Sequence, residues 1–296
     1  MSWYDDYAEH MINTEMYASE REIYLQKIMS KIKKHILPSV PLAGEVSSKG
    51  VLKEFEDYVS EISEDELDSF EKHNEQERNE YAKKESSLLK DMLKAVFGIT
   101  LGITSLALTK ALSAPFGKHT FQTFSKQLKS DVKESFVVPV RAAYSFGENA
   151  GDVKAVAEKR FEIVNKHALS DIRTSVTALQ RNIQRNAVSN RLKYQYVSML
   201  DDKTCLSCGG LSGNVYNSME EAPILPLHNR CRCYYLPIIE PVENMTYEEW
   251  ISSLPDSTVY KILGPARYAL YKSGIKIKDF SDNGKTLTLK ELFDSK

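Results

Sequence analysis

All four cysteines of the chain lie in one short stretch, together with a histidine. Cys205 and Cys208 form a C-x2-C pair, and nineteen residues separate Cys208 from His228, which opens an H-x2-C-x-C segment. Thiolates and imidazoles are the ligands that tetrahedral zinc prefers, and two ligand pairs joined by a spacer let the chain fold back around the ion. The spacing therefore predicts a zinc site formed by these residues with Cys231 and Cys233.

The stretch offers five candidate ligands for four positions. Binding both sulfurs of a C-x-C segment to one ion needs a tighter bend than binding His228 and Cys231, so Cys231 is the expected fourth ligand and Cys233 the alternative. Four protein ligands leave no open position for a catalytic water. The stretch also lacks the H-E-x-x-H and H-x-E arrangements that are typical of catalytic zinc sites. We therefore expect the zinc ion to be structural.

Three other interpretations of the cysteines compete with a metal site. One is a disulfide pair, although nothing in the sequence suggests export and cytosolic disulfides are rare. Another is a thioredoxin-like redox motif, which would place C-x2-C at the start of a helix. Glycines follow Cys208 at once, so we expect no helix there, and we expect Gly209 and Gly210 to serve a turn with positive φ. The third is a set of unrelated structural thiols.

This stretch resembles the signature of phage head morphogenesis proteins, the minor head proteins of tailed bacteriophages of the Mu F-like type. The family's usual ending is His-Pro-Asn-Cys-Arg-Cys, whereas residues 228–233 read His-Asn-Arg-Cys-Arg-Cys, which keeps the ligand spacing. The resemblance covers residues 140–240, and a further segment near 259–292 is also similar. Besides the five candidate ligands, it rests on Asp202, Leu211, Gly213, Tyr216, Pro226 and Arg232.

The resemblance implies a structural function in a virion. A minor head protein of this type would act near the portal in head assembly, DNA packaging or ejection. Its partners would be portal or major capsid proteins and packaged DNA, and it would pass from the host cytoplasm to the capsid interior or portal vertex. We expect no enzymatic activity, because the sequence has no G-x-S-x-G, Walker loop or glycine-rich nucleotide fingerprint.

The elements that must position these residues are mostly helices. Apolar residues recur at helical spacing in 3–36, 51–62, 92–113, 119–136, 153–168, 171–191, 247–254 and 256–271. Ser63 and Glu66 form a capping box, which predicts the start of a long polar helix that runs to Leu93. Its middle has almost no apolar residue, so we expect either a solvated helix or contacts with other proteins.

Three short strands are expected around the cysteines, at 192–200, 215–216 and 234–236, where aromatic and branched residues gather. A sheet of this size is marginal alone, and a bound metal holds such small units together. The expected fold class is α+β, with a predominantly helical N-terminal region and a small zinc-stapled β module packed on helices. The expected domains are a helical region at 1–130, a head-morphogenesis-like domain at 131–240 with the zinc-binding stretch 201–237, and a helical tail at 241–296.

One helix carries a basic stripe opposite its apolar face. No acidic residue occurs between Asp171 and Asp201. The stripe is either a solubilising surface or a contact for DNA phosphates or an acidic partner, so a DNA-binding zinc module is the alternative function. The whole chain has a net charge of −2, so such contacts would have to be local. The stripe consists of Arg173, Arg181, Arg185, Arg191 and Lys193.

The composition fits a chain that folds around a core. With 296 residues, 42% hydrophobic and 27% charged, it is long enough for one large or two ordinary domains. The longest weakly polar run, 95–109, is shorter than the ~20 residues that cross a bilayer and contains Gly98 and Gly102. We therefore expect a buried helix there and no stable membrane span.

Overall fold

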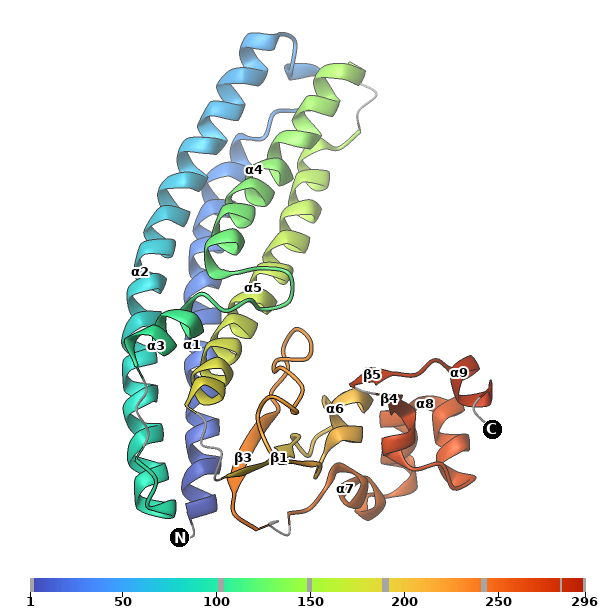
Figure 1. The fold of residues 1–296 in the computed structure, drawn as a ribbon. Coiled ribbons are helices and arrows are strands. Elements are labelled where there is room, and N and C mark those ends of the chain that lie inside the picture. Colours follow the sequence, from blue (N-terminus) through green and yellow to red (C-terminus); the bar gives the residue numbers. More distant parts are fainter. Residues whose placement is uncertain are drawn as a thin grey trace.

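The computed structural model of the chain describes residues 3–100, 104–147, 151–187, 192–240, 244–282 and 284–294. Four long helices lie side by side in an elongated bundle, and a small sheet and a C-terminal helical segment lie beside the half of the bundle that holds the N-terminus (Figure 1). The bundle helices are α1 (Trp3–Ile36), α2 (Lys49–Phe97), α4 (Phe121–Phe146) and α5 (Val153–Asn186). The expected α+β class is thereby confirmed.

Helix α2 is one continuous helix, so the prediction that a new helix starts at Ser63 was wrong. The helix begins after Ser48, whose hydroxyl accepts a hydrogen bond from the Val51 amide. Ser63 is buried, and its hydroxyl donates to the Val59 carbonyl one turn earlier at 2.6 Å. Gly98, with a left-handed φ of 66°, ends the helix. The apolar segment expected as one helix at 92–113 is consequently divided between α2 and α3 (Ser105–Leu112).

The polar middle of α2 is largely exposed, but a few of its polar side chains are buried on the side that faces α1 and α5. Arg78 and Glu85 are each only 3% exposed. The Glu85 carboxylate accepts a hydrogen bond from Gln180 at 2.8 Å and lies 2.9 Å from His10 Nε2. Arg78 donates to the Ser175 carbonyl at 3.3 Å. These partners satisfy polar groups that would otherwise make burial unfavourable, so the two side chains can face the interior of the bundle.

The bundle also contains continuous helices where the sequence pattern predicted separate ones. Pro139 lies inside α4 instead of ending a helix, and α5 connects the two helices expected at 153–168 and 171–191. The expected domain boundary at residue 130 falls within α4. One core cluster combines α1, α2, α4 and α5, so residues on both sides of that boundary share a core; it includes Leu25, Met29, Phe70, Phe136, Phe161 and Ile172.

The predicted strands form one antiparallel sheet beside α5. Its strands are β1 (Lys193–Val197), β2 (Val215–Tyr216) and β3 (Tyr234–Ile238), in the order β2-β1-β3. Tyr194 pairs with Tyr216, and Tyr196 pairs with Tyr235. Leu236 of the sheet is fully buried in a cluster with Leu179 and Ile183 of α5, so the sheet packs on this helix.

The C-terminal segment has its own small core, which includes Ile251, Val259, Ile277 and Phe280. Its two predicted helices are observed, and the second is kinked at Gly264. Within the described ranges, no helix has both the length and the apolar character that crossing a membrane requires. The elements are α7 (Tyr247–Ser253), α8 (Asp256–Lys272), the 3-10 turn Ile277–Phe280, β4 (Ser281–Asp282), β5 (Lys285–Thr286) and α9 (Leu289–Asp294).

Candidate metal centre

The C-x2-C pair opens a short helix, α6 (Leu206–Leu211), contrary to the expectation that no helix starts there. Cys205 caps this helix, because its sulfur accepts a hydrogen bond from the Cys208 amide at 3.5 Å. Gly209 and Gly210 lie inside α6 and not in a turn with positive φ, so that prediction was also wrong. Because a helix does start at the C-x2-C pair, the local structure gives no argument against a redox motif. The choice between a redox pair and a metal site therefore depends on the residues around the two cysteines.

The structure brings all five predicted ligands together. Cys205 Sγ and Cys208 Sγ each lie 3.2 Å from His228 Nε2, and Cys208 Sγ lies 3.9 Å from Cys231 Sγ. The ligand atoms form two groups, Cys205–Cys208–His228 and Cys208–Cys231–Cys233, each within 4.8 Å. Ligands at ~2.3 Å from one tetrahedral ion lie about 3.8 Å apart. The spacing of these atoms therefore fits a metal ion, and Cys208 belongs to both groups.

All four thiols are free, so none of them forms a disulfide. A hydrogen bond with Cys208 lowers the pKa of Cys205 to about 4 and that of Cys231 to about 2. Hydrogen bonds to the same two residues raise the pKa of Cys208 well above its ordinary value. These opposite shifts arise because the three sulfurs lie next to one another, with Cys208 between Cys205 and Cys231.

His228 is oriented as a metal ligand would be. Its Nδ1 lies 2.8 Å from the Asn229 carbonyl, so a proton on Nδ1 leaves Nε2 free to face the sulfurs. The Asn229 side-chain amide donates to Asp171 Oδ1 at 2.7 Å. The Arg230 amide donates to Thr174 Oγ1 at 2.9 Å. The ligand-bearing segment is therefore attached directly to α5.

An ion pair outside the predicted ligand set also holds the cysteine-containing stretch in place. Arg232 forms a bidentate ion pair with Asp201 at 2.6 and 2.8 Å. This hydrogen bonding from Arg232 holds the pKa of Asp201 below its ordinary value. Asp201 also accepts from Thr204 Oγ1 at 3.1 Å, and so fixes the turn that leads into Cys205. The sequence signal was an aspartate before C-x2-C and an arginine between the last two cysteines, but spacing alone could not pair them.

Only a small hollow lies beside the cluster. A hollow of about 10 Å³ adjoins Cys205, Cys208 and His228, which is room for one water molecule. Three cationic side chains line it, and two of them are held in ion pairs, Arg230 with Glu22 and Arg232 with Asp201; the third is Lys203.

The predicted basic stripe does not form one exposed surface. Arg181 is 3% exposed and donates from Nε to the Cys233 carbonyl at 2.8 Å. Arg173 forms ion pairs with Glu15 and Glu22 of α1, and Arg185 donates to the Ala222 carbonyl at 3.3 Å. Lys193 is exposed at the start of β1, and Arg191 lies outside the described residues. The sequence pattern could not reveal the hydrogen-bond and ion-pair partners of these arginines, because the partners lie in distant segments of the chain.

No protein family model, no curated protein and no solved structure matches this chain.

Proposed function

We propose that the cluster holds one structural zinc ion. The observation that carries this proposal is that four thiols and one imidazole from two chain segments form two ligand groups, which share Cys208 and each span at most 4.8 Å. This donor set is the one that selects zinc among common cellular metals. The small hollow beside the ligands also supports a structural rather than a catalytic ion.

The ion would join the start of α6 to the segment at 228–233. That segment is already tied to α5 through Asn229 and Arg230, and it leads into β3. Arg181 donates to the Cys233 carbonyl from the interior of the bundle. A bound ion would thus hold the small, marginally stable sheet in place on the helices. The contacts of Asn229, Arg230 and Arg181 would orient the segment that carries the ligands.

Elemental analysis of protein purified without added metal tests the zinc site. We expect one zinc ion per chain, removed together with the fold of the sheet by a strong chelator. A metal content near zero, with the cysteines recovered as disulfides, would refute the site.

We further propose that the protein is a structural minor head protein of a tailed bacteriophage, acting near the portal in head assembly, DNA packaging or ejection. The residues of the phage-head signature support this proposal, because several of them occupy defined positions in the small sheet that adjoins the cysteines. Tyr216 pairs with β1, and Gly213, at φ 87°, lets the chain pass close to Thr246. The DNA-binding alternative loses support, because Arg181 is buried and Arg173 is held by two glutamates.

The virion proposal is tested by complementing a phage that lacks this gene and blotting purified heads. Wild-type protein should be present in heads, and Cys208→Ser should be reduced or absent. The exposed Glu240→Gln variant, which lies outside the signature residues, is the control and should be packaged normally. Heads that assemble and infect normally without the protein would refute the proposal.

A further inference from the structure

One side of α1 is exposed along most of its length. Its exposed residues follow one another at alternating steps of four and three, which is the spacing of a coiled-coil seam. At 100° per residue they lie within about 100° of one another on the helix, opposite the buried residues Leu25, Met29 and Ile32. This stripe is ~38 Å long, and it consists of Glu9, Asn13, Met16, Glu20, Ile23, Lys27, Ser30 and Lys34.

The two halves of the stripe carry opposite charges. Glu9 and Glu20 lie in its N-terminal half, whereas Lys27 and Lys34 lie in its C-terminal half. Charges of one sign that are separated from charges of the other sign along a helix face determine the orientation in which a second helix can pack on it.

The middle of the stripe exposes apolar side chains. Met16 and Ile23 are 59% and 55% exposed, and Ile12 beside them is 57% exposed. Single exposed apolar residues are common, but three large ones on the same face of one helix are typical of a contact surface.

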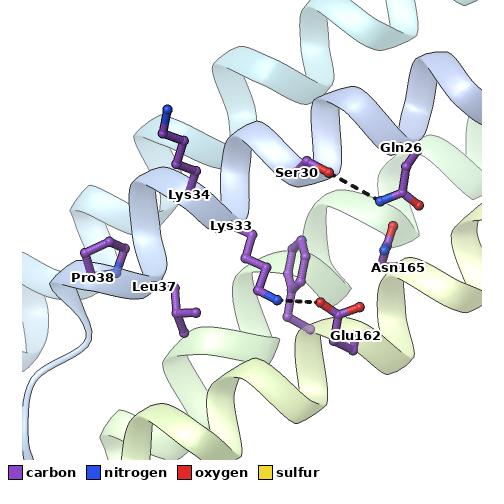
Figure 2. A pocket seen from close by; sticks show the side chains of 9 residues that line it. Gln26, Ser30, Lys33, Lys34, Leu37, Pro38, Glu162 and Asn165 are labelled. Atoms are coloured by element: carbon purple, nitrogen blue, oxygen red, sulfur yellow. Dashed lines mark hydrogen bonds and ion pairs between the residues drawn. The ribbon is translucent and has the colours of Figure 1, made fainter.

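The charged residues beside the stripe are already paired within the chain. Toward α2, Lys31 lies 2.5 Å from Glu66, and toward α5, Lys33 lies 2.6 Å from Glu162. Figure 2 shows Lys33 turned toward Glu162, whereas Lys34 points away from α5. Within the described part of the chain, the four charged residues of the stripe form no ion pair and no side-chain hydrogen bond. They are therefore available to a partner.

A second copy of α1 matches this order of charges when it runs antiparallel. A two-fold axis between residues 21 and 22 places Glu9 of each copy opposite Lys34 of the other, and Asn13 opposite Ser30. A parallel pair would instead place each charge beside its like, which is unfavourable. The charge order therefore selects the antiparallel arrangement.

The same register brings the apolar side chains together at the two-fold axis. Met16 and Ile23 of the two copies alternate along the seam at intervals of about 5 Å. Glu20 of each copy lies one helical turn from Lys27 of the other, so a second pair of opposite charges flanks the apolar centre on each side.

We propose that the stripe of α1 binds a second copy of this chain in an antiparallel, two-fold symmetric dimer. A contact of this kind uses the same surface on both copies, so it closes on itself and does not extend into a filament. The seam is narrow and mostly polar, so we expect the dimer to form at micromolar concentrations. The stripe contains no ligand of the candidate metal centre, so the dimer does not depend on the zinc proposal.

Sedimentation equilibrium of the full-length protein tests the dimer. We expect the unaltered chain to dimerise, and Glu9→Lys and Lys34→Glu each to associate about tenfold more weakly, because each places like charges opposite each other. A 1:1 mixture of the two variants should recover the affinity of the unaltered chain, since every altered charge then faces its opposite. Misfolding of either variant could not produce this recovery.

Two further variants check the assignment. Ile23→Ser should weaken association about fivefold, because it removes apolar surface at the two-fold axis. Lys126→Glu reverses an exposed charge on α4 and is the matched control, so it should dimerise like the unaltered chain. Zinc content should be the same in all these variants, which distinguishes a failure of the dimer from a failure of the metal centre.

Three results would overturn the proposal. A chain that stays monomeric at several hundred micromolar would leave the stripe to a different protein. A dimer that neither charge reversal weakens would show that the two copies meet through another face. A mixture of Glu9→Lys with Lys34→Glu that associates no better than either variant alone would contradict the antiparallel register.

Discussion

The Tyr247 ring lies against the backbone of Gly209, so the C-terminal segment docks directly on the helix that carries Cys208. A Cβ atom at residue 209 would overlap this ring. The Tyr247 hydroxyl donates to the Thr204 carbonyl at 3.2 Å, and its amide donates to Ser212 Oγ at 3.1 Å. The candidate metal centre thus connects the bundle on one side with the C-terminal segment on the other.

Gly209→Ala should detach the C-terminal segment. The added methyl group has no space, and overpacking of this kind costs about 1–3 kcal/mol. Denaturant unfolding measures the loss, and hydrogen exchange should show it at 247–294. Gly50→Ala is the control, because its Cβ would meet only Ser48 Oγ at 3.5 Å in the first turn of α2. That variant should be neutral or more stable, and equal destabilisation of both would contradict this docking contact.

Cys208→Ser should release the metal and loosen two regions together. Cys208 belongs to both ligand groups, and structural zinc contributes on the order of 10 kcal/mol in small modules. Hydrogen exchange should rise in 193–238 and in 247–294, while the bundle keeps its protection. Ser207→Ala, which loses only a hydroxyl contact with Thr286 at 2.6 Å, should keep its zinc. Retention of zinc by Cys208→Ser would contradict the assignment.

The fourth ligand can be assigned by comparing two substitutions. We expect Cys231→Ser to lose zinc and Cys233→Ser to keep one ion per chain, because Cys231 Sγ lies 3.9 Å from Cys208 Sγ, which is close to the separation of two ligands on a tetrahedral ion. Competition with a colorimetric chelator measures both affinities. The reverse order would make Cys233 the ligand.

The ligands and strands were predictable because residue type and spacing encode them locally. Cys205, Cys208 and His228 are brought together as expected, and three strands occur close to the expected positions. The α6 helix was missed because glycines normally disfavour helices; here the close approach of Tyr247 to Gly209 requires them.

The burial of single polar side chains of α2 could not be read from the sequence for a different reason. A charged residue is expected at the surface unless a partner accompanies it into the interior. The partners of Glu85 are His10 and Gln180, which lie far away in the chain. The pairing of Asp201 with Arg232 depends in the same way on a fold that local periodicity does not reveal.

Arg181→Met should destabilise the protein far more than Arg173→Met. Arg181 is buried, and its removal leaves the Cys233 carbonyl without its donor, at a cost of about 2–4 kcal/mol. Arg173 is partly exposed in its ion pairs, so its loss should cost about 1 kcal/mol or less. Denaturant unfolding measures both values. Similar small effects would show that Arg181 does not anchor the metal-binding segment.

Asp201→Asn should lower the free energy of unfolding at neutral pH and leave it unchanged in acid. Arg232 holds the pKa of Asp201 below its ordinary value, so the pair stabilises the fold above the unfolded pKa of about 3.9. That contribution is lost as the pH falls through the lowered folded pKa. We therefore expect the difference in stability between wild type and variant to stay constant from about pH 8 to pH 5 and to shrink below that.

Thermal unfolding with excess zinc measures this difference at each pH. It should be at most about 1 kcal/mol, because the pair is partly exposed to solvent. The exposed neighbour Asp202→Asn should match wild type throughout. A difference that grows toward acid pH would mean that the variant acts through the metal ligands, which must release the ion when protonated, and not through the ion pair of Asp201 with Arg232.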